Sequence, residues 1–431
     1  MADPQETTAA GTSTVEPADV LVAGGGYVGL STAVAIKHQA PHLAVTLVDA
    51  APEGAELSDT RASAIAAAAS RMLDRLGLWE RMRPHAQPIT EMIVTDSRTA
   101  DPQRPVFLTF GGERVSGHQG SAGDEPFAHM LSNKVLVETL REAAADLGVE
   151  LVFGRKVEAF RDRGGWVEVS LDDGTMRPAR LLAAADGVRS KLRALAGIRT
   201  VRVPYDQMGI VTTVSHELEH GGRAEEHFLP AGPFAILPVR APDGSGTWSS
   251  LVWTERKAAA ERLLKADEFT FELELERRFG KKLGRVEVVG PRAAYPLSLT
   301  LARDFVRPRL ALVGDAAHGI HPIAGQGLNL GFKDAAALAQ VVVEADRLGL
   351  DVGALDVLER YQRWRRFDTV QMGLVTDGLN RLFSNDSTLL RTARTVGLGI
   401  VDRMPALKRM FIDQAAGRGA NTPNLLRGLP I

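Results

Sequence analysis

The sequence predicts an α/β fold: a nucleotide-binding domain with a parallel sheet, discontinuous along the chain, an inserted mixed and antiparallel β-sheet domain, and a C-terminal helical tail. Three observations carry this prediction. A buried strand leads through a glycine-bearing turn into a helix at 19–39, at 180–193 and at 309–345, which is typical of parallel-sheet units. Residues 201–255 are dense in strand patterns. The chain beyond 345 has helical periodicity.

The individual elements follow from the spacing of apolar residues. The elements predicted before residue 200 are strands beginning at 19 and at 44–50, a mostly helical segment at 57–83, strands at 89–95 and 105–110, a capped helix at 132–149, and short strands near 151–160 and 166–171. After the strand-rich segment, we predict a charged helix at 256–283 and two further helices at 354–383 and 386–416.

These elements divide the chain into a leader, two interleaved domains and a tail. Residues 1–17 are small, polar and acidic, which predicts a disordered leader. The predicted limits are 18–88, 116–200 and 286–345 for the nucleotide-binding domain, 89–115 and 201–285 for the inserted β-sheet domain that would bind the substrate, and 346–431 for the helical region.

Composition excludes several classes of function. The 431 residues include 51 Lys and Arg against 53 Asp and Glu, so the formal charge of −2 gives no general reason to bind nucleic acid. The chain has no cysteine, which excludes disulfides, thiolate catalysis, iron–sulfur clusters and cysteine-bound zinc. Any redox chemistry must therefore come from a bound cofactor.

The sequence predicts a cytoplasmic protein. Residues 1–17 contain neither a basic region nor an apolar core, so no targeting signal is predicted there. No apolar run approaches the length of about 18 residues that a membrane span needs. Contact with the inner face of the cytoplasmic membrane stays open.

The first glycine turn carries a dinucleotide fingerprint. Gly24, Gly26 and Gly29 follow a strand and open a helix, where they would allow a tight turn, close approach of a pyrophosphate and close helix–strand packing. Asp49 ends the next strand, 20 residues after Gly29, where a carboxylate can accept both hydroxyls of an adenosine ribose. This fingerprint alone does not distinguish NAD from FAD.

Two later motifs make that distinction. Asp186 and Gly187 stand between a strand and a helix, and Gly314-Asp315 ends another strand shortly before Gly325-Gln326-Gly327-Leu328-Asn329 opens a long helix. With these motifs the chain resembles the single-component FAD-dependent aromatic hydroxylases. The strings at 59–79, 227–238 and 295–334 narrow the resemblance to the ubiquinone-biosynthesis hydroxylase family over roughly 18–415.

The resemblance implies a discontinuous Rossmann-type FAD domain and specific residue roles. Asp315 would bind the flavin ribityl chain, and Arg61 would lie against the FAD. Asp186 and Gly187 would contact both FAD and NAD(P)H, and Asn133 would approach the cofactor from the start of a helix. Leu328 and Asn329 belong to the same cofactor-binding string.

The start of the helix near 325 also suits a reduced flavin on physical grounds, independently of the resemblance. Reduced flavin carries negative charge on its pyrimidine ring, and a glycine-rich helix start offers unpaired N–H groups and a positive dipole end. Gly325 and Gly327 would also let backbone approach where a side chain would clash. We therefore assign the catalytic environment to Pro322, Gly325, Gln326 and Gly327.

The function implied is an NAD(P)H-dependent monooxygenase that hydroxylates the ring of a polyprenylated phenol in ubiquinone biosynthesis. NAD(P)H would reduce the flavin, O2 would form a C4a-hydroperoxide, and the ring would attack it, with no side-chain nucleophile. Two alternatives stay open: a hydroxylase of another phenol, and a nucleotide-binding relative without turnover. Subunits of a ubiquinone-biosynthesis complex also stay open as partners.

Residues 227–238 are expected to form an apolar wall facing the flavin. The members assigned to the substrate are Phe228, Pro230, Gly232, Pro233, Leu237 and Pro238. The alternative is a hairpin that packs into the core of its own domain. The neighbouring Glu225 and Glu226 are interpreted as a solvated strand edge.

Two remaining patterns are ambiguous. His318, His321 and Asp315 are close in sequence, but the intervening glycine and the following proline do not favour a helical ligand pair, and no metal is predicted. The basic and apolar residues of the C-terminal helices would pack on the protein itself, or contact an anionic membrane or a partner subunit.

Overall fold

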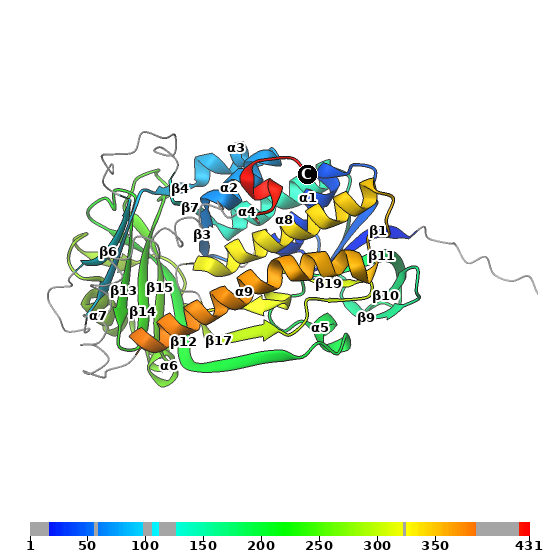
Figure 1. Cartoon of the computed structure of the whole chain (residues 1–431). Helices are drawn as coiled ribbons and strands as arrows, with labels where there is room; N and C mark the ends of the chain where they lie inside the picture. Colours follow the sequence, from blue (N-terminus) through cyan, green and yellow to red (C-terminus); the bar gives the residue numbers. More distant parts are fainter. Residues whose placement is uncertain (1–16, 56–58, 98–105, 112–125, 322–324, 385–421) are drawn as a thin grey trace, which may run out of the picture.

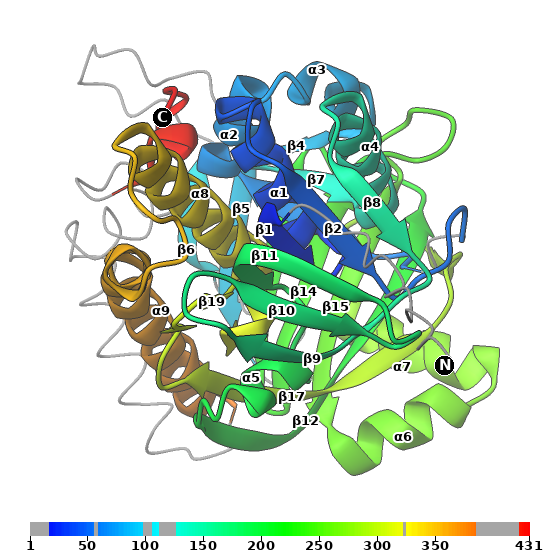
Figure 2. The ribbon, with the colours of Figure 1, turned by 90° about the vertical axis from the view of Figure 1, so that its right-hand side faces the viewer.

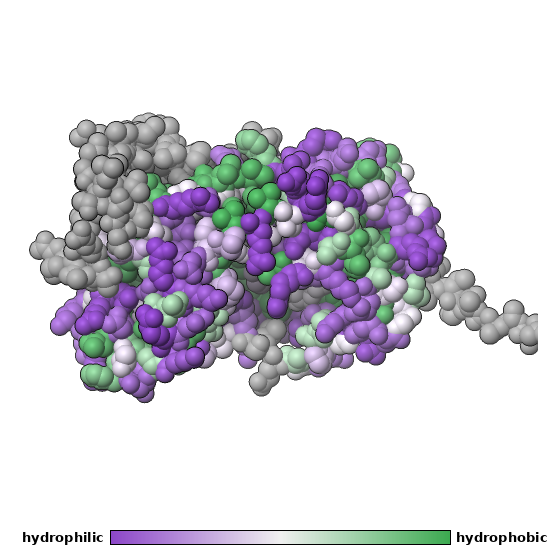
Figure 3. Space-filling model, turned by 90° about the horizontal axis from the view of Figure 1, so that it is seen from below, coloured by the Kyte–Doolittle hydropathy of each residue, from purple (hydrophilic) through white to green (hydrophobic). Residues whose placement is uncertain are grey.

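The computed structural model describes residues 17–55, 59–97, 106–111, 126–321, 325–384 and 422–431. Its helices and strands form two sheet-based halves joined side by side (Figure 1). Sheet topology confirms the predicted α/β class, because a largely parallel sheet and a largely antiparallel sheet occur in the same chain. The underside of the molecule is a mosaic of hydrophilic residues and separate hydrophobic patches (Figure 3).

The eight-stranded sheet forms the nucleotide-binding half. Its strands run in the order β18 (Val306–Arg307), β19 (Leu310–Leu312), β11 (Met176–Ala184), β1 (Ala18–Ala23), β2 (Val45–Asp49) and β8 (Glu150–Phe153), with β10 (Val167–Leu171) on β11 and β9 (Val157–Asp162) on β10. The pairs β19–β11, β11–β1, β1–β2 and β2–β8 are all parallel. The inner strands are apolar along their length because such a sheet is covered on both faces.

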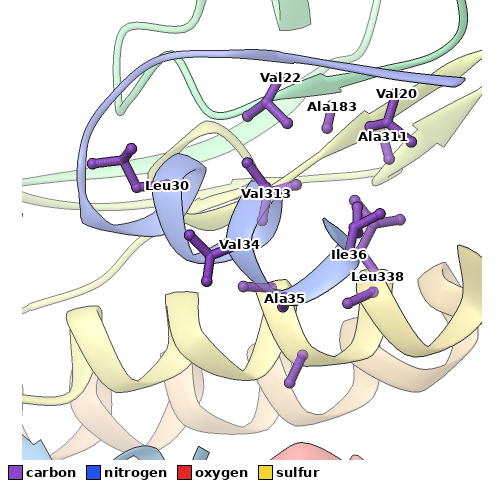
Figure 4. Close-up of a cluster of buried hydrophobic side chains, with 14 of the residues drawn as sticks. Val20, Val22, Leu30, Val34, Ala35, Ile36, Ala183, Ala311, Val313 and Leu338 are labelled. Carbon is purple, nitrogen blue, oxygen red and sulfur yellow. The ribbon is translucent and has the colours of Figure 1, made fainter. Parts of the chain in front are cut away.

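Helix α1 (Tyr27–Gln39) lies in the centre of this half. Every residue from Gly29 to Ile36 is buried, because the helix packs on the sheet and also contacts α4 (Asn133–Asp146) and α8 (Gln326–Arg347). Leu30, Val34 and Ile36 meet Val20, Ala311 and Leu338 in one cluster (Figure 4). A helix that is apolar all round is typical of such a fully enclosed position.

The nine-stranded sheet forms the other half. Its order is β20 (His318–Gly319), β17 (Ala293–Ala302), β12 (Thr200–His216), β15 (Trp248–Arg256), β14 (Gly232–Val239), β13 (Arg223–Leu229), β5 (Glu91–Asp96) and β6 (Val106–Gly111), with β16 (Val286–Val288) on β12. β16 and β17 belong to this sheet although the predicted limit placed 286–345 in the nucleotide-binding domain. The domain limits as a whole stay a prediction.

The outer face of this sheet is covered by two helices, where one was predicted. The segment 256–283 contains α6 (Lys257–Lys265) and α7 (Glu268–Phe279). Asp267 separates them: its side chain accepts a hydrogen bond of 2.7 Å from the Thr270 N–H and so starts a new helix.

A small third sheet corrects another prediction. The segment 57–83 is not mostly helical, because β3 (Ala62–Ala66) precedes α2 (Ala67–Arg75), α3 (Trp79–Met82) and a 3-10 turn, η1 (Arg83–His85). β3 pairs with β7 (Ala128–Ser132), which also pairs with β4 (Gln87–Ile89). Long-range pairing here overrides the helix preference of alanine.

Two long helices complete the described structure. α9 (Leu355–Phe383) matches the helix predicted at 354–383 and lies beside α8 (Figure 2). The remaining short elements are α5 (Lys191–Leu195) and the 3-10 turns η2 (Gly314–Ala316) and η4 (Asn424–Arg427). The helix predicted at 386–416 and almost all of the predicted leader lie outside the described residues.

A buried charged network ties these two helices to the parallel sheet. Asp334 of α8 accepts hydrogen bonds from the Gly314 N–H at 2.9 Å, from Nε of Arg365 on α9 at 2.7 Å, and from Nε2 of His318. The side chains of Asp334, His318 and Arg365 are wholly inaccessible. Burial alone would raise the pKa of Asp334, but His318 and Arg365 hold it below its ordinary value.

We expect Asp334→Asn to destabilise the protein by about 3–5 kcal/mol, because it leaves the Arg365 guanidinium in the interior without its carboxylate. Thermal and urea unfolding would measure the change. Asp368→Asn is the matched control: Asp368 also pairs with Arg365, at 3.0 Å, but is partly exposed, so it should cost no more than about 1 kcal/mol. Equal losses in the two variants would contradict the central role of Asp334.

Candidate active site

The motifs singled out from the sequence meet at one edge of the parallel sheet. Gly24, Asp49, Asp186 and Asp315 lie at or just beyond the carboxyl ends of β1, β2, β11 and β19. The strand register aligns these ends, with Ala23 opposite both Val48 and Ala184. The carboxyl edge of an open α/β sheet is where such folds bind nucleotides.

The glycine turn after β1 combines tight packing with open space. Gly24 has a φ of +116°, and a Cβ on Gly29 would lie 1.9 Å from the Gly24 carbonyl oxygen, so both positions need glycine for the fold itself. Among the residues that the structure describes, none comes within 4 Å of a Cβ placed on Gly26, and no side chain caps α1 by a hydrogen bond. Free N–H groups beside open space fit a pyrophosphate.

Gly25 is a residue that the sequence reasoning missed. A Cβ at this position would lie 2.3 Å from a carboxylate oxygen of Asp49. The missing side chain therefore lets the Asp49 carboxylate lie against the glycine turn, where the ribose next to a pyrophosphate would be. The three adjacent glycines were the available signal, but the fingerprint spacing assigned roles to only two of them.

A cavity of about 390 Å³ lies between this edge and the nine-stranded sheet. The predicted cofactor residues that line it are Arg61, Asn133, Asp315, Gly325, Gly327 and Leu328. Gly24, Gly26, Gly29 and Asp49 are outside the cavity lining, at the turn where the adenosine end would bind. We therefore expect the flavin ring and the substrate in this cavity, and the adenosine part of FAD at the glycine turn.

Arg61 is held by a pair of charged hydrogen bonds. Its Nε and one terminal nitrogen each donate to a carboxylate oxygen of Asp59 at 2.6 Å, and its guanidinium carbon lies 5.4 Å from the centre of the Tyr295 ring. Asn133 donates to the same Asp59 at 2.8 Å and accepts from Ser63 at 2.7 Å. These bonds fix Arg61 and Asn133 on one wall of the cavity.

The Asp315 carboxyl faces the cavity from the Gly-Asp turn. Burial by the surrounding protein raises its pKa, while His318 and Arg61 lower it and Asp334 raises it further. Tyr27 lies on the same wall, and burial followed by the charge of Asp315 raises its pKa to about 12. A carboxylate in this setting gains from hydroxyl donors such as those of a ribityl chain.

Asp186 caps a helix rather than lining the cavity. Its two carboxylate oxygens accept from Ser190 Oγ at 2.6 Å and from the Leu192 N–H at 3.1 Å, at the start of α5. The next residue, Gly187, has a φ of +82°. From α5, Arg193 donates to the Ala316 carbonyl at 2.7 Å. The motif therefore supports the Gly-Asp turn, and its contact with FAD and NAD(P)H stays a prediction.

The start of α8 lies on the cavity wall. Gly325 adopts a left-handed conformation with a φ of +61°, and a Cβ on Gly327 would meet nothing within 4 Å. Asn329 instead bonds to β3, accepting from the Ala66 N–H and donating to the Ala64 carbonyl. Asn329 thus joins α8 to β3, and its contact with the cofactor stays a prediction.

Two of the predicted catalytic positions cannot be placed fully. Pro322 lies outside the described residues, and the side chain of Gln326 is not described. The described part of this string is compatible with a flavin: a Cβ on Gly327 would meet nothing within 4 Å, and within the described ranges no side-chain hydrogen bond caps α8. Uncapped N–H groups at a helix start can bind the negatively charged edge of a reduced flavin.

The opposite wall is one face of the nine-stranded sheet. Glu226, Ala235, Val252 and Val211 are consecutive partners across four strands, and all four line the cavity. Of the residues assigned to the substrate, only Leu237 lines it. β14 contributes Ala235 and Leu237 to the lining, and strand alternation turns the residues between them to the other face of the sheet.

The other members of the predicted substrate wall have packing roles. Phe228 stacks on Phe383 with ring centres 4.3 Å apart, and a Cβ on Gly232 would lie 2.4 Å from a methyl group of Thr254. Pro233 and Pro238 are buried, and Pro230 is half-buried in the turn before β14. Phe228 thus contacts α9 and Gly232 packs against β15, and the substrate role of these residues stays a prediction.

Glu225 and Glu226 do not form a solvated edge. β13 is hydrogen-bonded on both sides, to β14 and to β5, and the two residues are only 9% and 4% exposed. Glu225 pairs with Lys282 and His227, whereas Glu226 lines the cavity. The edge interpretation was wrong because β5 comes from a segment about 130 residues earlier.

The histidines near the Gly-Asp turn have separate environments. His318 belongs to the Asp334 network. His321 lies edge-on to the Tyr205 ring at 5.5 Å, and burial lowers its pKa to about 4. Within the described ranges, no group of three or more metal-ligating side chains comes together.

A family model described as an FAD binding domain matches residues 17–366. Ubiquinone hydroxylase UbiL of Rhodospirillum rubrum is 43% identical over 100% of this chain and 97% of its own. The 3-demethoxyubiquinol 3-hydroxylase of Escherichia coli is 32% identical over 94% of this chain and 100% of its own.

Among solved structures, p-nitrophenol 4-monooxygenase PnpA from Pseudomonas putida superposes with a TM-score of 0.72. The match covers 92% of this chain and 96% of PnpA at 22% identity. At that identity the likeness shows a shared fold.

We expect Asp315→Ala to leave the protein folded but to weaken FAD binding by about 10- to 100-fold, the usual effect of removing a charged hydrogen-bond acceptor. Flavin content after purification and FAD titration of the apoprotein would measure the effect. Asp304→Ala, which removes an exposed carboxylate outside the cavity, is the control and should retain FAD normally. Unchanged flavin affinity in Asp315→Ala would refute the ribityl role.

Proposed function

Because this chain belongs to the FAD-binding family of flavin-dependent monooxygenases, we propose that it hydroxylates the aromatic ring of a polyprenylated phenol in ubiquinone biosynthesis. NAD(P)H is the reductant and O2 the co-substrate. The names of the relatives supply the substrate class. The observation that carries the proposal is the cavity with an uncapped helix start on one side and a largely apolar sheet face on the other.

Different residues of this chain bind different parts of FAD. Gly24, Gly26 and the start of α1 hold the pyrophosphate, and Asp49 holds the adenosine ribose. Asp315 holds the ribityl chain, and the start of α8 at Gly325 faces the flavin ring. When bound there, FAD supplies the oxygen-activating chemistry that no side chain of the cysteine-free protein can provide.

The sheet face orients the phenol and keeps water from the reacting ring. Ala235, Val252 and Val211 form a smooth apolar row across neighbouring strands. A cavity of about 390 Å³ is within the range of small-molecule binding sites. Excluding water protects a reactive oxygen species from unproductive breakdown.

A hydroxylase of a small aromatic acid is a weaker alternative. Binding a carboxylate substrate calls for a free guanidinium or ammonium group at the cavity. Among the described lining residues, Arg61 is the only arginine or lysine. Two of its guanidinium nitrogens already donate hydrogen bonds to the Asp59 carboxylate. The lining thus favours a neutral, apolar phenol.

The alternative of a relative without turnover is not retained, because the similar proteins are named as hydroxylases.

The function is tested with the FAD-loaded protein, NAD(P)H and a short-chain polyprenyl phenol. We expect NAD(P)H-dependent oxygen uptake and a product one oxygen atom heavier by mass spectrometry. Deleting the gene in its host should cause a ubiquinone precursor that lacks one hydroxyl group to accumulate. A colourless protein without oxygen uptake, or a host with a normal ubiquinone pool, would contradict the proposal.

Peripheral contact with a membrane is part of the proposal, since a polyprenylated substrate dissolves in lipid. Within the described residues, no helix has both the length and the apolar character to cross a bilayer. On α9, Phe367, Val370 and Leu374 recur at helical spacing and are 73%, 37% and 64% exposed, which supports contact with a lipid surface or a partner subunit.

We expect Phe367→Glu with Leu374→Glu to reduce sedimentation with anionic phospholipid vesicles by several-fold while oxygen uptake with a soluble phenol is unchanged. Phe269→Glu is the control, because Phe269 is 77% exposed on α7, away from α9. If the double variant sediments with the vesicles as well as the wild type does, this face of α9 is not the membrane contact.

A further inference from the structure

The cavity reaches the surface of the molecule beside Val188. This residue lines the cavity and is nevertheless 45% exposed, so it marks an opening. Its side chain lies against the strand β20, because a Cβ placed on Gly319 would come within 3.1 Å of a methyl group of Val188. Gly319 also lines the cavity. A ligand that enters here therefore passes the loop after β11, which carries Val188, and the β20 end of the nine-stranded sheet.

Arg202 lies on the same face of the nine-stranded sheet as this opening. Gly319 is paired with Thr300 of β17, and Thr300 is paired with Arg202 of β12. Directly paired residues of antiparallel strands have their side chains on one face, so the Arg202 side chain is on the face against which Val188 packs. Two interstrand spacings, or about 10 Å, separate Arg202 from Gly319. The exposed Arg202 side chain therefore stands close to the opening.

Three further arginines surround the same place. Arg189 follows Val188 directly in the loop after β11. Arg199 and Arg303 are neighbours, because the Arg303 N–H donates a hydrogen bond of 2.8 Å to the Arg199 carbonyl, just beyond the ends of β12 and β17. All three residues are exposed. Together with Arg202 they form an arginine cluster at the mouth of the cavity.

The positive charge of the arginine cluster is not offset by carboxylates. None of its side chains forms an ion pair or a hydrogen bond with the residues that the structure describes. The acidic side chains nearby are engaged elsewhere: Glu158 pairs with Lys191, Asp304 pairs with Arg307, and Asp186 caps α5. Because guanidinium groups close together repel one another, a bound anion stabilises such a cluster. Phosphate is well suited, since it accepts paired hydrogen bonds from a guanidinium group.

We propose that the arginine cluster binds the phosphate groups of NAD(P)H, so that the nicotinamide enters the cavity beside Val188. The inference rests on the proposed function and adds the place where the reductant binds. NAD(P)H is the polyanion that the reaction requires: its pyrophosphate is charged, and NADPH carries a further phosphate on the adenosine ribose. The predicted contact of Asp186 and Gly187 with NAD(P)H agrees with this place, because both residues precede Val188 in the same loop.

The test measures nucleotide binding to the FAD-loaded protein. Calorimetry gives the dissociation constants of NAD⁺ and NADP⁺, and anaerobic flavin reduction gives those of NADH and NADPH together with the limiting rate. Arg202→Gln and the double variant Arg199→Gln with Arg303→Gln should each weaken binding by about 5- to 10-fold, because charged hydrogen bonds to phosphate are lost. The limiting rate of flavin reduction should stay unchanged, since the cluster contacts the phosphates and not the nicotinamide.

Two comparisons sharpen the result. A larger loss for NADPH than for NADH assigns part of the cluster to the ribose phosphate, whereas equal losses assign it to the shared pyrophosphate. Salt should weaken nucleotide binding to the wild type more steeply than to the variants, because exposed charges are screened. Arg75→Gln is the matched control: Arg75 is an exposed arginine on α2, outside the cluster and the cavity lining, and its loss should leave nucleotide binding and FAD content unchanged.

The competing anion is an acidic phospholipid surface, and the outcomes separate it from the nucleotide. Unchanged nucleotide affinity in Arg202→Gln and in the double variant overturns the proposal. So does a loss of sedimentation with anionic vesicles in the same variants while nucleotide affinity is kept, which would make the cluster a membrane contact. A wild type that binds NAD(P)H through the cluster but hydroxylates no polyprenyl phenol is instead the failure of the proposed function, because binding and hydroxylation are measured in separate assays.

Discussion

The arrangement of the site depends on the buried carboxylate of Asp334. It holds the backbone of the Gly-Asp turn after β19, the ring of His318 on β20 and the guanidinium of Arg365 on α9. Because a buried ion pair compensates its desolvation only with good geometry, these three elements have little freedom to shift. Asp315 follows Gly314 directly, so its place at the cavity is determined by an interaction in which it takes no part.

The chemistry is divided between two sheets of different character. The parallel sheet collects the ends of its strands at one edge, which gives backbone N–H groups and carboxylates for a charged cofactor. The antiparallel sheet offers a nearly continuous apolar face, suited to a ring that must react away from water. Neither half has both properties, so the catalytic cavity arises only where they meet.

Features that depend on residues close together in sequence could be predicted from the sequence, whereas features that depend on pairing between distant strands could not. The strand, turn and helix at 19–39 and the helix α9 match the predicted elements, because each depends on residues close together in sequence. The strand β3 was predicted as part of a helix, since its pairing with β7 involves residues about 65 positions away. Glu226 was assigned to a solvated edge for the same reason: its burial depends on β5, and no pattern within 220–240 reveals that partner. Which alternate residues of β14 face the cavity also depends on the assembled sheet.

The length of β12 has a mechanical consequence. This single strand of 17 residues begins beside α5 and continues through the nine-stranded sheet, where it lies between β17 and β15 (Figure 1). β17 accompanies it in an antiparallel ladder, and the end of β17 is bonded to the loop after the Gly-Asp turn through Ala302 and Ala317. A hinge between the two halves would have to break this ladder or bend it at the irregularity between Pro204 and Met208. The sheet face that lines the cavity and the edge that carries Asp315 are therefore expected to move as one frame, and a ligand would not enter by separation of the halves.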